Sequence, residues 1–93
     1  LKILKVAAYL YGNGKKVAGG GKGGFSIGAG QTVTIDNVAE WSGFTGENNV
    51  AIVNEGTLNI QDTVMTGNTT DIENDAVLNL SGSTSVSYWE IVL

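Results

Sequence analysis

The sequence predicts an all-β protein: a short parallel β-helix, or β-solenoid, of about three coils with flanking terminal strands. The first observation is an internal repeat between Val50 and Leu80, in which the second half restates the first at a fixed offset of about 20 residues, the length that closes one coil. The coils above and below would then bury its inner face. The second observation is a composition of 14 glycines, no proline and few charges, which is typical of strands and turns. The repeat pairs Ile52 with Ile72, Asn54 with Asn74, Glu55 with Asp75, Leu58 with Leu78, Asn59 with Asn79 and Ile60 with Leu80.

The body of the solenoid is expected over residues 25–93. Residues 32–35 alternate polar and apolar side chains, as a half-buried strand does. The second and third coils are expected over 50–69 and about 70–88, and the extra five residues of the first coil are expected as an outward loop within 37–47. Residues 86–93 are apolar and strand-like but leave the repeat. Three pairs align the first coil with the second at one common, longer offset: Val33 with Leu58, Ile35 with Ile60 and Ile27 with Ile52.

Residues 1–17 are expected to form a terminal strand or hairpin arm. Residues 1–11 suit either a helix that ends at Gly12 or a strand, and their β-favouring side chains favour the strand. Asn13-Gly14 is a strong signal for a hairpin turn, after which residues 15–17 would return antiparallel. Five glycines in 18–24 predict a flexible linker, so the arm need not pack on the body.

Charge divides the chain into a basic head and an acidic body. All five lysines lie within residues 1–22, and all nine acidic residues lie within 36–90. Such asymmetry indicates charge-complementary contact within the chain or between copies. Because a solenoid with open ends exposes apolar surface and strand edges, assembly is expected. The expected assembly residues are Leu1, Ile3, Leu4, Val6, Tyr9, Tyr11, Tyr88, Trp89 and Ile91.

Two other groups of side chains are candidates for binding. Trp41 and Phe44 suit either a platform for a sugar or partner, or cover for the flank of the coil. Glu55 and Asp75 would lie one above the other, where they could bind calcium or act as acid and base, or simply be solvated turn residues. The stacked asparagines are expected to form structural ladders.

One coil resembles a known family. Val50-Ala51-Ile52 followed by Met65-x-x-Asn68 is similar to the right-handed parallel β-helix passengers of autotransporter adhesins and polymorphic outer-membrane proteins, whose repeats read Gly-Gly-Ala-Ile and Phe-x-x-Asn. The resemblance covers a little under half of the chain. It implies surface display, adhesion or assembly. Those passengers have many coils, so this chain is expected to be a fragment or to stack with copies of itself.

We therefore expect a structural subunit of an extracellular or cell-surface filament that assembles with itself. The subunits would be joined by β-strand addition of the N-terminal arm, by end-to-end stacking of solenoids, or by both. The alternative is an adhesion or glycan-binding module excised from a larger surface protein. The sequence has no His and no Arg, and its lysines all lie in the head, so we expect no enzyme. We also expect no cofactor, no metal site, no nucleic-acid partner and no transmembrane segment.

Overall fold

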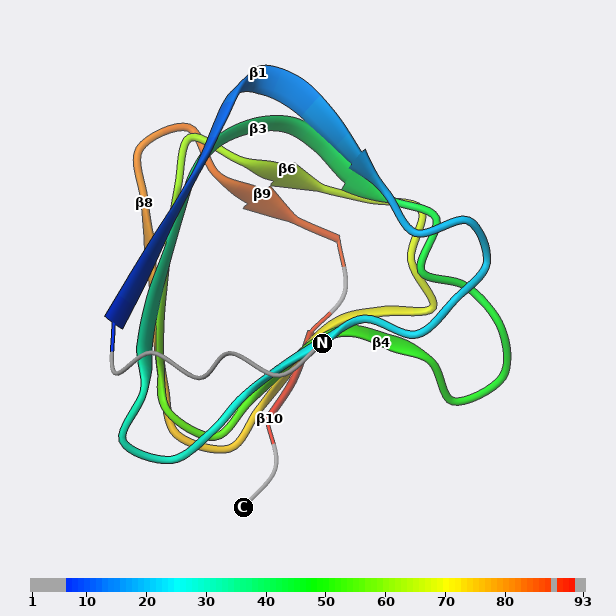
Figure 1. Cartoon of the computed structure of the whole chain (residues 1–93). Helices are drawn as coiled ribbons and strands as arrows, with labels where there is room; N and C mark the ends of the chain where they lie inside the picture. The colour runs from blue at the N-terminus through cyan, green and yellow to red at the C-terminus, as the bar shows by residue number, and fades with distance from the viewer. Residues whose placement is uncertain (1–6, 88, 92–93) are drawn as a thin grey trace.

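The computed structural model describes residues 7–87 and 89–91, the last three by their backbone alone. In this part the chain is a parallel β-solenoid of about three turns, with strands and no helix. Figure 1 shows the chain winding round a three-sided coil whose successive turns lie on one another. The predicted fold class is confirmed.

The three faces of the coil are each four strands deep, and neighbouring strands on every face are parallel. The first face contains β1, β3, β5 and β8, and the second contains the far halves of β1 and β3 with β6 and β9. The third face contains β2, β4, β7 and β10. The bounds are β1 Ala7–Ala18, β2 Phe25–Ile27, β3 Thr32–Ser42, β4 Val50–Asn54, β5 Thr57–Gln61, β6 Val64–Met65, β7 Thr70–Asn74, β8 Val77–Ser81, β9 Ser85–Val86 and β10 Trp89–Ile91.

The strand register confirms the repeat and shows where the first coil is longer. β4 pairs with β7, and β5 with β8, at the constant offset that places Asn54 beside Asn74. β3 pairs with β5 at an offset that is longer by five positions, with Thr34 beside Asn59. Four of these five extra positions lie between Trp41, which pairs with Met65, and Val50, which pairs with Thr70. The expected outward loop therefore lies mainly in residues 43–49.

The predicted pairing of Ile27 with Ile52 is wrong, because Ile27 lies beside Asn54. Residues 28–31 connect β2 to β3, whereas only residues 55 and 56 connect β4 to β5. The two additional residues form a tight turn in which Gln31 N donates to Gly28 O at 3.1 Å. The turn shifts the third face by two positions, so that Phe25 is the residue beside Ile52.

The corner between the first and second faces is a column of residues in the left-handed backbone region. Asn37, Asp62 and Gly82 have φ values of 57°, 49° and 62°. Asn, Asp and Gly tolerate this region best. Asn13 and Gly14 adopt it too, and β1 bends there and continues parallel to β3. The predicted antiparallel hairpin is therefore wrong, whereas the preference for a strand is confirmed for residues 7–11, since β3 offers β1 a parallel edge with the same bend.

The glycine-rich segment 18–24 is packed against the next coil rather than free. Gly19 N donates to Ser42 O at 2.8 Å. A Cβ on Gly24 would overlap the backbone of Ala51, so only glycine lets the two chains pass this closely. The expected loose tether of β1 is not found.

The C-terminal strand continues the solenoid. β10 pairs with β7 in parallel, with Trp89 beside Ile72 and Ile91 beside Asn74. The sequence predicted that this segment leaves the repeat. That prediction is wrong, because β10 stays in the stack. The last coil is shorter than the one before it, but β10 keeps the place of its predecessors on the third face.

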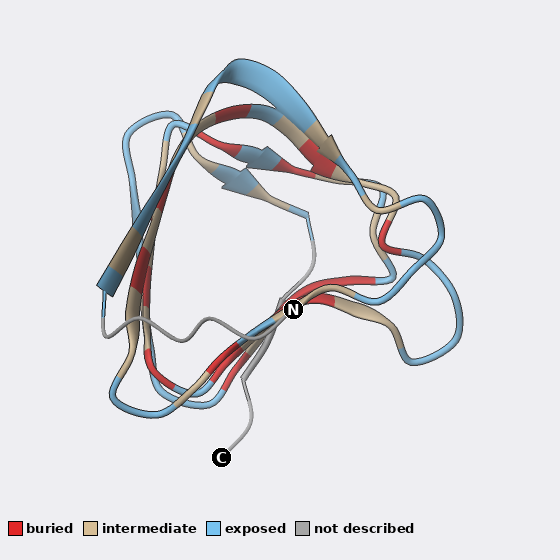
Figure 2. Ribbon diagram, viewed as in Figure 1, coloured by how far each residue is buried: buried red, intermediate tan, exposed pale blue. Residues whose placement is uncertain are grey.

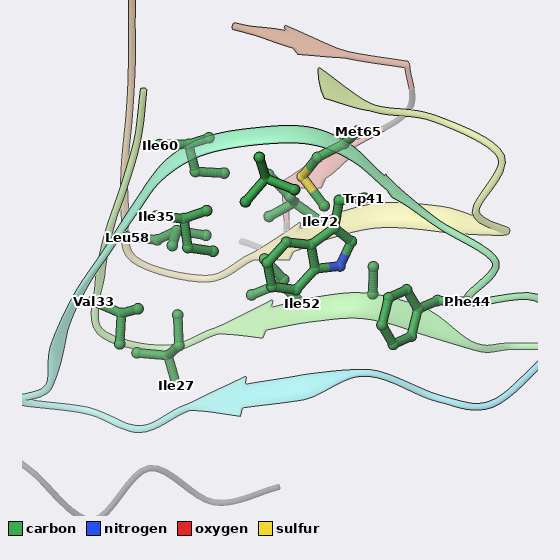
Figure 3. Close-up of a cluster of buried hydrophobic side chains, with 12 residues drawn as sticks. Ile27, Val33, Ile35, Trp41, Phe44, Ile52, Leu58, Ile60, Met65 and Ile72 are labelled. Atoms are coloured by element: carbon green, nitrogen blue, oxygen red, sulfur yellow. The ribbon is translucent and has the colours of Figure 1, made fainter. Parts of the chain in front are cut away.

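Buried residues alternate with more exposed ones along β3 and β5 (Figure 2), and the buried apolar side chains form one core inside the coil (Figure 3). The rings of Phe25, Trp41 and Phe44 contact one another with centroids 5.4 to 6.1 Å apart. The indole N–H of Trp41 has no hydrogen-bond partner in the described part, a cost of ~1–3 kcal/mol that the ring packing offsets. The buried core consists of Ile27, Val33, Ile35, Val38, Trp41, Phe44, Ala51, Ile52, Leu58, Ile60, Met65 and Ile72.

Candidate functional site

The two ends of the stack expose side chains that belong to the core column. Leu10, Ile35, Ile60 and Leu80 lie in register on β1, β3, β5 and β8. The inner two are 3% and 0% exposed, whereas Leu10 is 39% and Leu80 44% exposed. All four side chains occupy the same inward position. The exposure of the end residues therefore follows from the lack of a further coil in the described part, and not from their residue type.

The same ends present strand edges. In the described part of the chain, β1 pairs with β3 alone and β8 pairs with β5 alone. Each therefore has one side of its main chain unpaired by a neighbouring strand, which is a template for pairing with another chain. An apolar cavity of about 60 Å³ also lies at the β1 end. It is lined by Leu10, Phe25, Ile27, Val33, Ile35, Trp41 and Ile52.

The charges are arranged along the stack. The described lysines are exposed and lie at the β1 end: Lys15 and Lys16 are in β1, and Lys22 lies between β1 and β2. The exposed acids are spread over the rest of the stack: Glu47 and Glu55 flank β4, Asp62 follows β5 and Asp75 follows β7. One end of the particle is therefore basic, and the acids follow along the stack.

A buried asparagine ladder holds the middle coils in register. Asn54, which is 0% exposed, donates through Nδ2 to Asn74 Oδ1 at 2.7 Å and to Val77 O at 2.8 Å. Its Oδ1 accepts from Gly56 N at 3.1 Å and so closes the corner. On the outside of the first face, Asn79 Nδ2 donates to Asn59 Oδ1 at 2.8 Å. The predicted stacking of both asparagine pairs is confirmed.

A second polar staple links three coils. Asn68 Nδ2 donates to Trp41 O at 2.9 Å and to Asp71 Oδ1 at 2.7 Å, and Asn68 Oδ1 accepts from Phe44 N at 3.1 Å. The other carboxylate oxygen of Asp71, Oδ2, accepts from Ser87 N at 2.7 Å. Asp71 is 1% exposed, so its charge is balanced by donors inside the coil. The staple ties the last coil to the two before it.

The aromatic platform expected at Trp41 and Phe44 is wrong. The two side chains are 1% and 5% exposed and point into the core (Figure 3). Buried rings have no face to offer a sugar or a partner. The other interpretation, as cover for the flank of the coil, correctly made them structural, but the two rings lie in the core itself.

The assembly residues that the sequence predicted fall into three groups. Tyr9 and Tyr11 are exposed on β1, on the outer side of the first face. Trp89 and Ile91 lie in β10, whose backbone alone is described. Leu1, Ile3, Leu4, Val6 and Tyr88 lie outside the described residues.

Glu55 and Asp75 are exposed turn residues at matching corners. Glu55 N donates to Ile27 O, and Asp75 N donates to Asn54 O, both at 2.9 Å. Within 7–87 and 89–91, no group of three or more His, Cys, Asp or Glu side chains is arranged to hold a metal ion. The same residues contain no helix long and apolar enough to cross a membrane.

No known protein family, curated protein or solved structure matches this chain.

The end residues Leu10 and Leu80 were missed as assembly candidates from the sequence. A signal was present: Leu80 is the last member of the repeat, and Leu10 precedes Ile35 by the same interval that separates Ile35 from Ile60. The interval from Asn37 to Asp62 equals that from Ile35 to Ile60, and the interval from Asp62 to Gly82 equals that from Ile60 to Leu80. Carrying the period outward in both directions would have placed both the ends and the corner column.

Proposed function

We propose that the chain is the structural subunit of an extracellular or cell-surface filament, in which solenoids join end to end. The observation that carries the proposal is the column of four in-register residues whose inner members are buried and whose outer members, Leu10 and Leu80, stay exposed. A second copy placed on either end would complete this column. The resemblance to surface-displayed β-helix passengers supports the location.

The direction of growth is head to tail. The β8 edge of one copy would receive the β1 edge of the next, which continues the parallel sheet of the first face. The lysines at the β1 end would then approach the β8 end of the neighbour, where the exposed Asp75 precedes β8. Because the two contacting surfaces are different, the contact does not close into a dimer and repeats into a filament.

The strength of each junction can be bounded. Full burial of a leucine side chain contributes ~1.5–3 kcal/mol, so burying the exposed parts of Leu10 and Leu80 contributes ~1–2 kcal/mol in all. The five residues of β8 would add about five main-chain hydrogen bonds at ~1 kcal/mol each. The gross total is ~6–7 kcal/mol before the cost of lost translational and rotational freedom, so assembly requires at least roughly micromolar to tens of micromolar concentration.

The deciding experiment uses two lysine variants and their mixture. Leu10→Lys blocks the β1 end, and Leu80→Lys blocks the β8 end, so each alone should be monomeric by sedimentation velocity while the wild type forms filaments in electron micrographs. An equimolar mixture should stop at dimers, because each variant retains one intact end. Val64→Lys is the matched control, since Val64 is 37% exposed but lies on the side of the stack, and it should still form filaments.

A wild type that stays monomeric at every concentration would refute the proposal. Dimers formed by one variant alone would mean that identical ends meet, which would also overturn head-to-tail growth. Circular dichroism of both variants checks that the coil is intact.

Strand donation is the other way to join subunits, and it requires β1 to leave its own β3. Ala7 and Thr32 are register partners on these two strands, at a spacing that suits a disulfide. The chain has no cysteine, so Ala7→Cys with Thr32→Cys introduces one pair. If the oxidised, internally cross-linked monomer still forms filaments, end-to-end stacking is supported. Loss of filaments that returns on reduction would assign the junction to strand donation.

A further inference from the structure

Two tyrosines on the side of the stack are oriented against the usual pattern. A tyrosine commonly buries its ring and leaves its hydroxyl in water. Here Tyr9 is 62% and Tyr11 58% exposed, while both hydroxyls are engaged by the chain. The Tyr9 hydroxyl donates to Asp36 and accepts from Gln61 Nε2 at 3.3 Å, and the Tyr11 hydroxyl accepts from Asn37 Nδ2 at 3.3 Å. These five residues form what we call the tyrosine strip.

The hydrogen bonds fix the rings in place. Asp36 and Asn37 belong to β3 and Gln61 to β5, so the Tyr9 side chain reaches from β1 across the neighbouring strand. Tyr9 and Tyr11 are two residues apart on one strand and point to the same side, ~7 Å apart along it. Pinned rings lose little conformational entropy when a ligand covers them.

The surface beside the rings can hold a small cyclic group. A hollow of about 300 Å³ lies next to Tyr9, lined by Ala7, Ala8, Tyr9, Thr32 and Thr34. Beyond it, hydroxyl and amide groups continue across the first face, where Asn59 Nδ2 donates to Thr34 Oγ1 at 3.4 Å. The surface thus combines bare aromatic area with a row of uncharged hydrogen-bonding groups.

The charge of the strip restricts what it can bind. Asp36 is the one ionisable acid among the five residues, and its carboxylate already accepts from Tyr9. The nearest lysines along β1, Lys15 and Lys16, lie beyond the corner on the second face. An anionic ligand would therefore find no opposite charge within the strip, and the single carboxylate is already engaged by Tyr9.

We propose that the tyrosine strip binds a neutral polysaccharide built of pyranose rings. A pyranose ring has an apolar C–H face and a rim of hydroxyls. The C–H face fits the exposed tyrosine rings, and the hydroxyls fit the amide and hydroxyl groups beside them. Tyr9 and Tyr11 lie on β1, the strand that would join the next copy, but their rings face outward from the stack rather than along it. In a filament the strip would recur once in each subunit, and a long glycan could contact several copies.

The test is native gel electrophoresis in gels that contain hydroxyethylcellulose, with the protein held monomeric by Leu80→Lys. The mobility of this protein should fall as the polymer concentration rises. Tyr9→Ala and Tyr11→Ala should each weaken the apparent Kd by about two- to tenfold, and the double variant by the product. Tyr9→Phe retains the ring and should weaken binding less than Tyr9→Ala. Val64→Ala, on the second face, should leave the mobility unchanged.

Four results would overturn the proposal. The first is no retardation of the Leu80→Lys protein by the neutral polymer. The second is equal retardation of the double alanine variant. The third is equal or stronger retardation by anionic polygalacturonate, which would assign binding to the lysines. The fourth is a change in sedimentation, without polysaccharide, when Tyr9→Ala and Tyr11→Ala are introduced together into the wild-type chain. The strip would then be a contact between copies. None of the gel measurements depends on filament formation. A negative gel result would therefore refute the polysaccharide proposal without refuting the end-to-end junction.

Discussion

Replacing Asn54 by alanine should cost far more stability than replacing Asn59, although both asparagines stack on a partner in the next coil. Asn54 is fully buried, and its side chain satisfies Asn74 Oδ1, Val77 O and Gly56 N. Asn54→Ala leaves these three groups without that partner, two of them in buried bonds and Val77 O in a part-buried one.

The magnitude follows from the number of groups. Each buried polar group left unpaired costs ~1–3 kcal/mol, and partial relaxation brings the expected loss to ~3–5 kcal/mol. A 93-residue chain has a total stability of ~5–14 kcal/mol, so the variant should lose a large share of it. Asn59 is partly exposed, and water can replace its bonds to Thr34 and Asn79. Asn59→Ala should cost less than ~1 kcal/mol.

The assay is urea unfolding followed by tryptophan fluorescence, at one low protein concentration and in the Leu80→Lys background. A shift in midpoint at constant slope reports a change in stability alone. If the two variants lose the same free energy within ~0.5 kcal/mol, the buried ladder does not hold the coils in register and the reasoning fails.

Three further outcomes are expected. Gly24→Ala should destabilise strongly or prevent folding, because its Cβ would overlap the facing backbone, whereas Gly23→Ala should be tolerated in thermal unfolding, since its Cβ meets only one side-chain oxygen at 3.6 Å. The hydrogen bond to Asp36 raises the pKa of Tyr9 above 10.0, so the stabilising contribution of the Tyr9 hydroxyl is complete below pH 10.0 and is lost as the pH rises through the raised pKa. The difference in unfolding free energy between wild type and Tyr9→Phe should therefore shrink in that pH range. A difference that grows there would contradict the direction of the pKa shift. Asp71→Ala should release the last coil, seen as faster amide hydrogen exchange in β9, while unchanged exchange would argue against the staple.

The course of the middle coils could be predicted because their information is local and periodic. Ile52, Leu58 and Ile60 recur at a fixed offset, and a parallel stack is the arrangement that places such residues over one another. The same periodicity predicted the asparagine ladders. It predicted less where the coil length changes: the longer corner before β3 moved Ile27 beside Asn54, and no periodic signal reveals such an insertion.

The sequence by itself determined an all-β coil, its period and its division into basic and acidic parts, since these depend on residue type and spacing alone. Tertiary structure decided what each end and side of that coil offers. Asn13-Gly14 bends β1 instead of reversing it, because β3 supplies a parallel edge that bends at the same point. Trp41 is buried and Tyr9 is exposed for the same reason: burial depends on which side of the coil a strand turns inward, and that is settled only when neighbouring turns are in register.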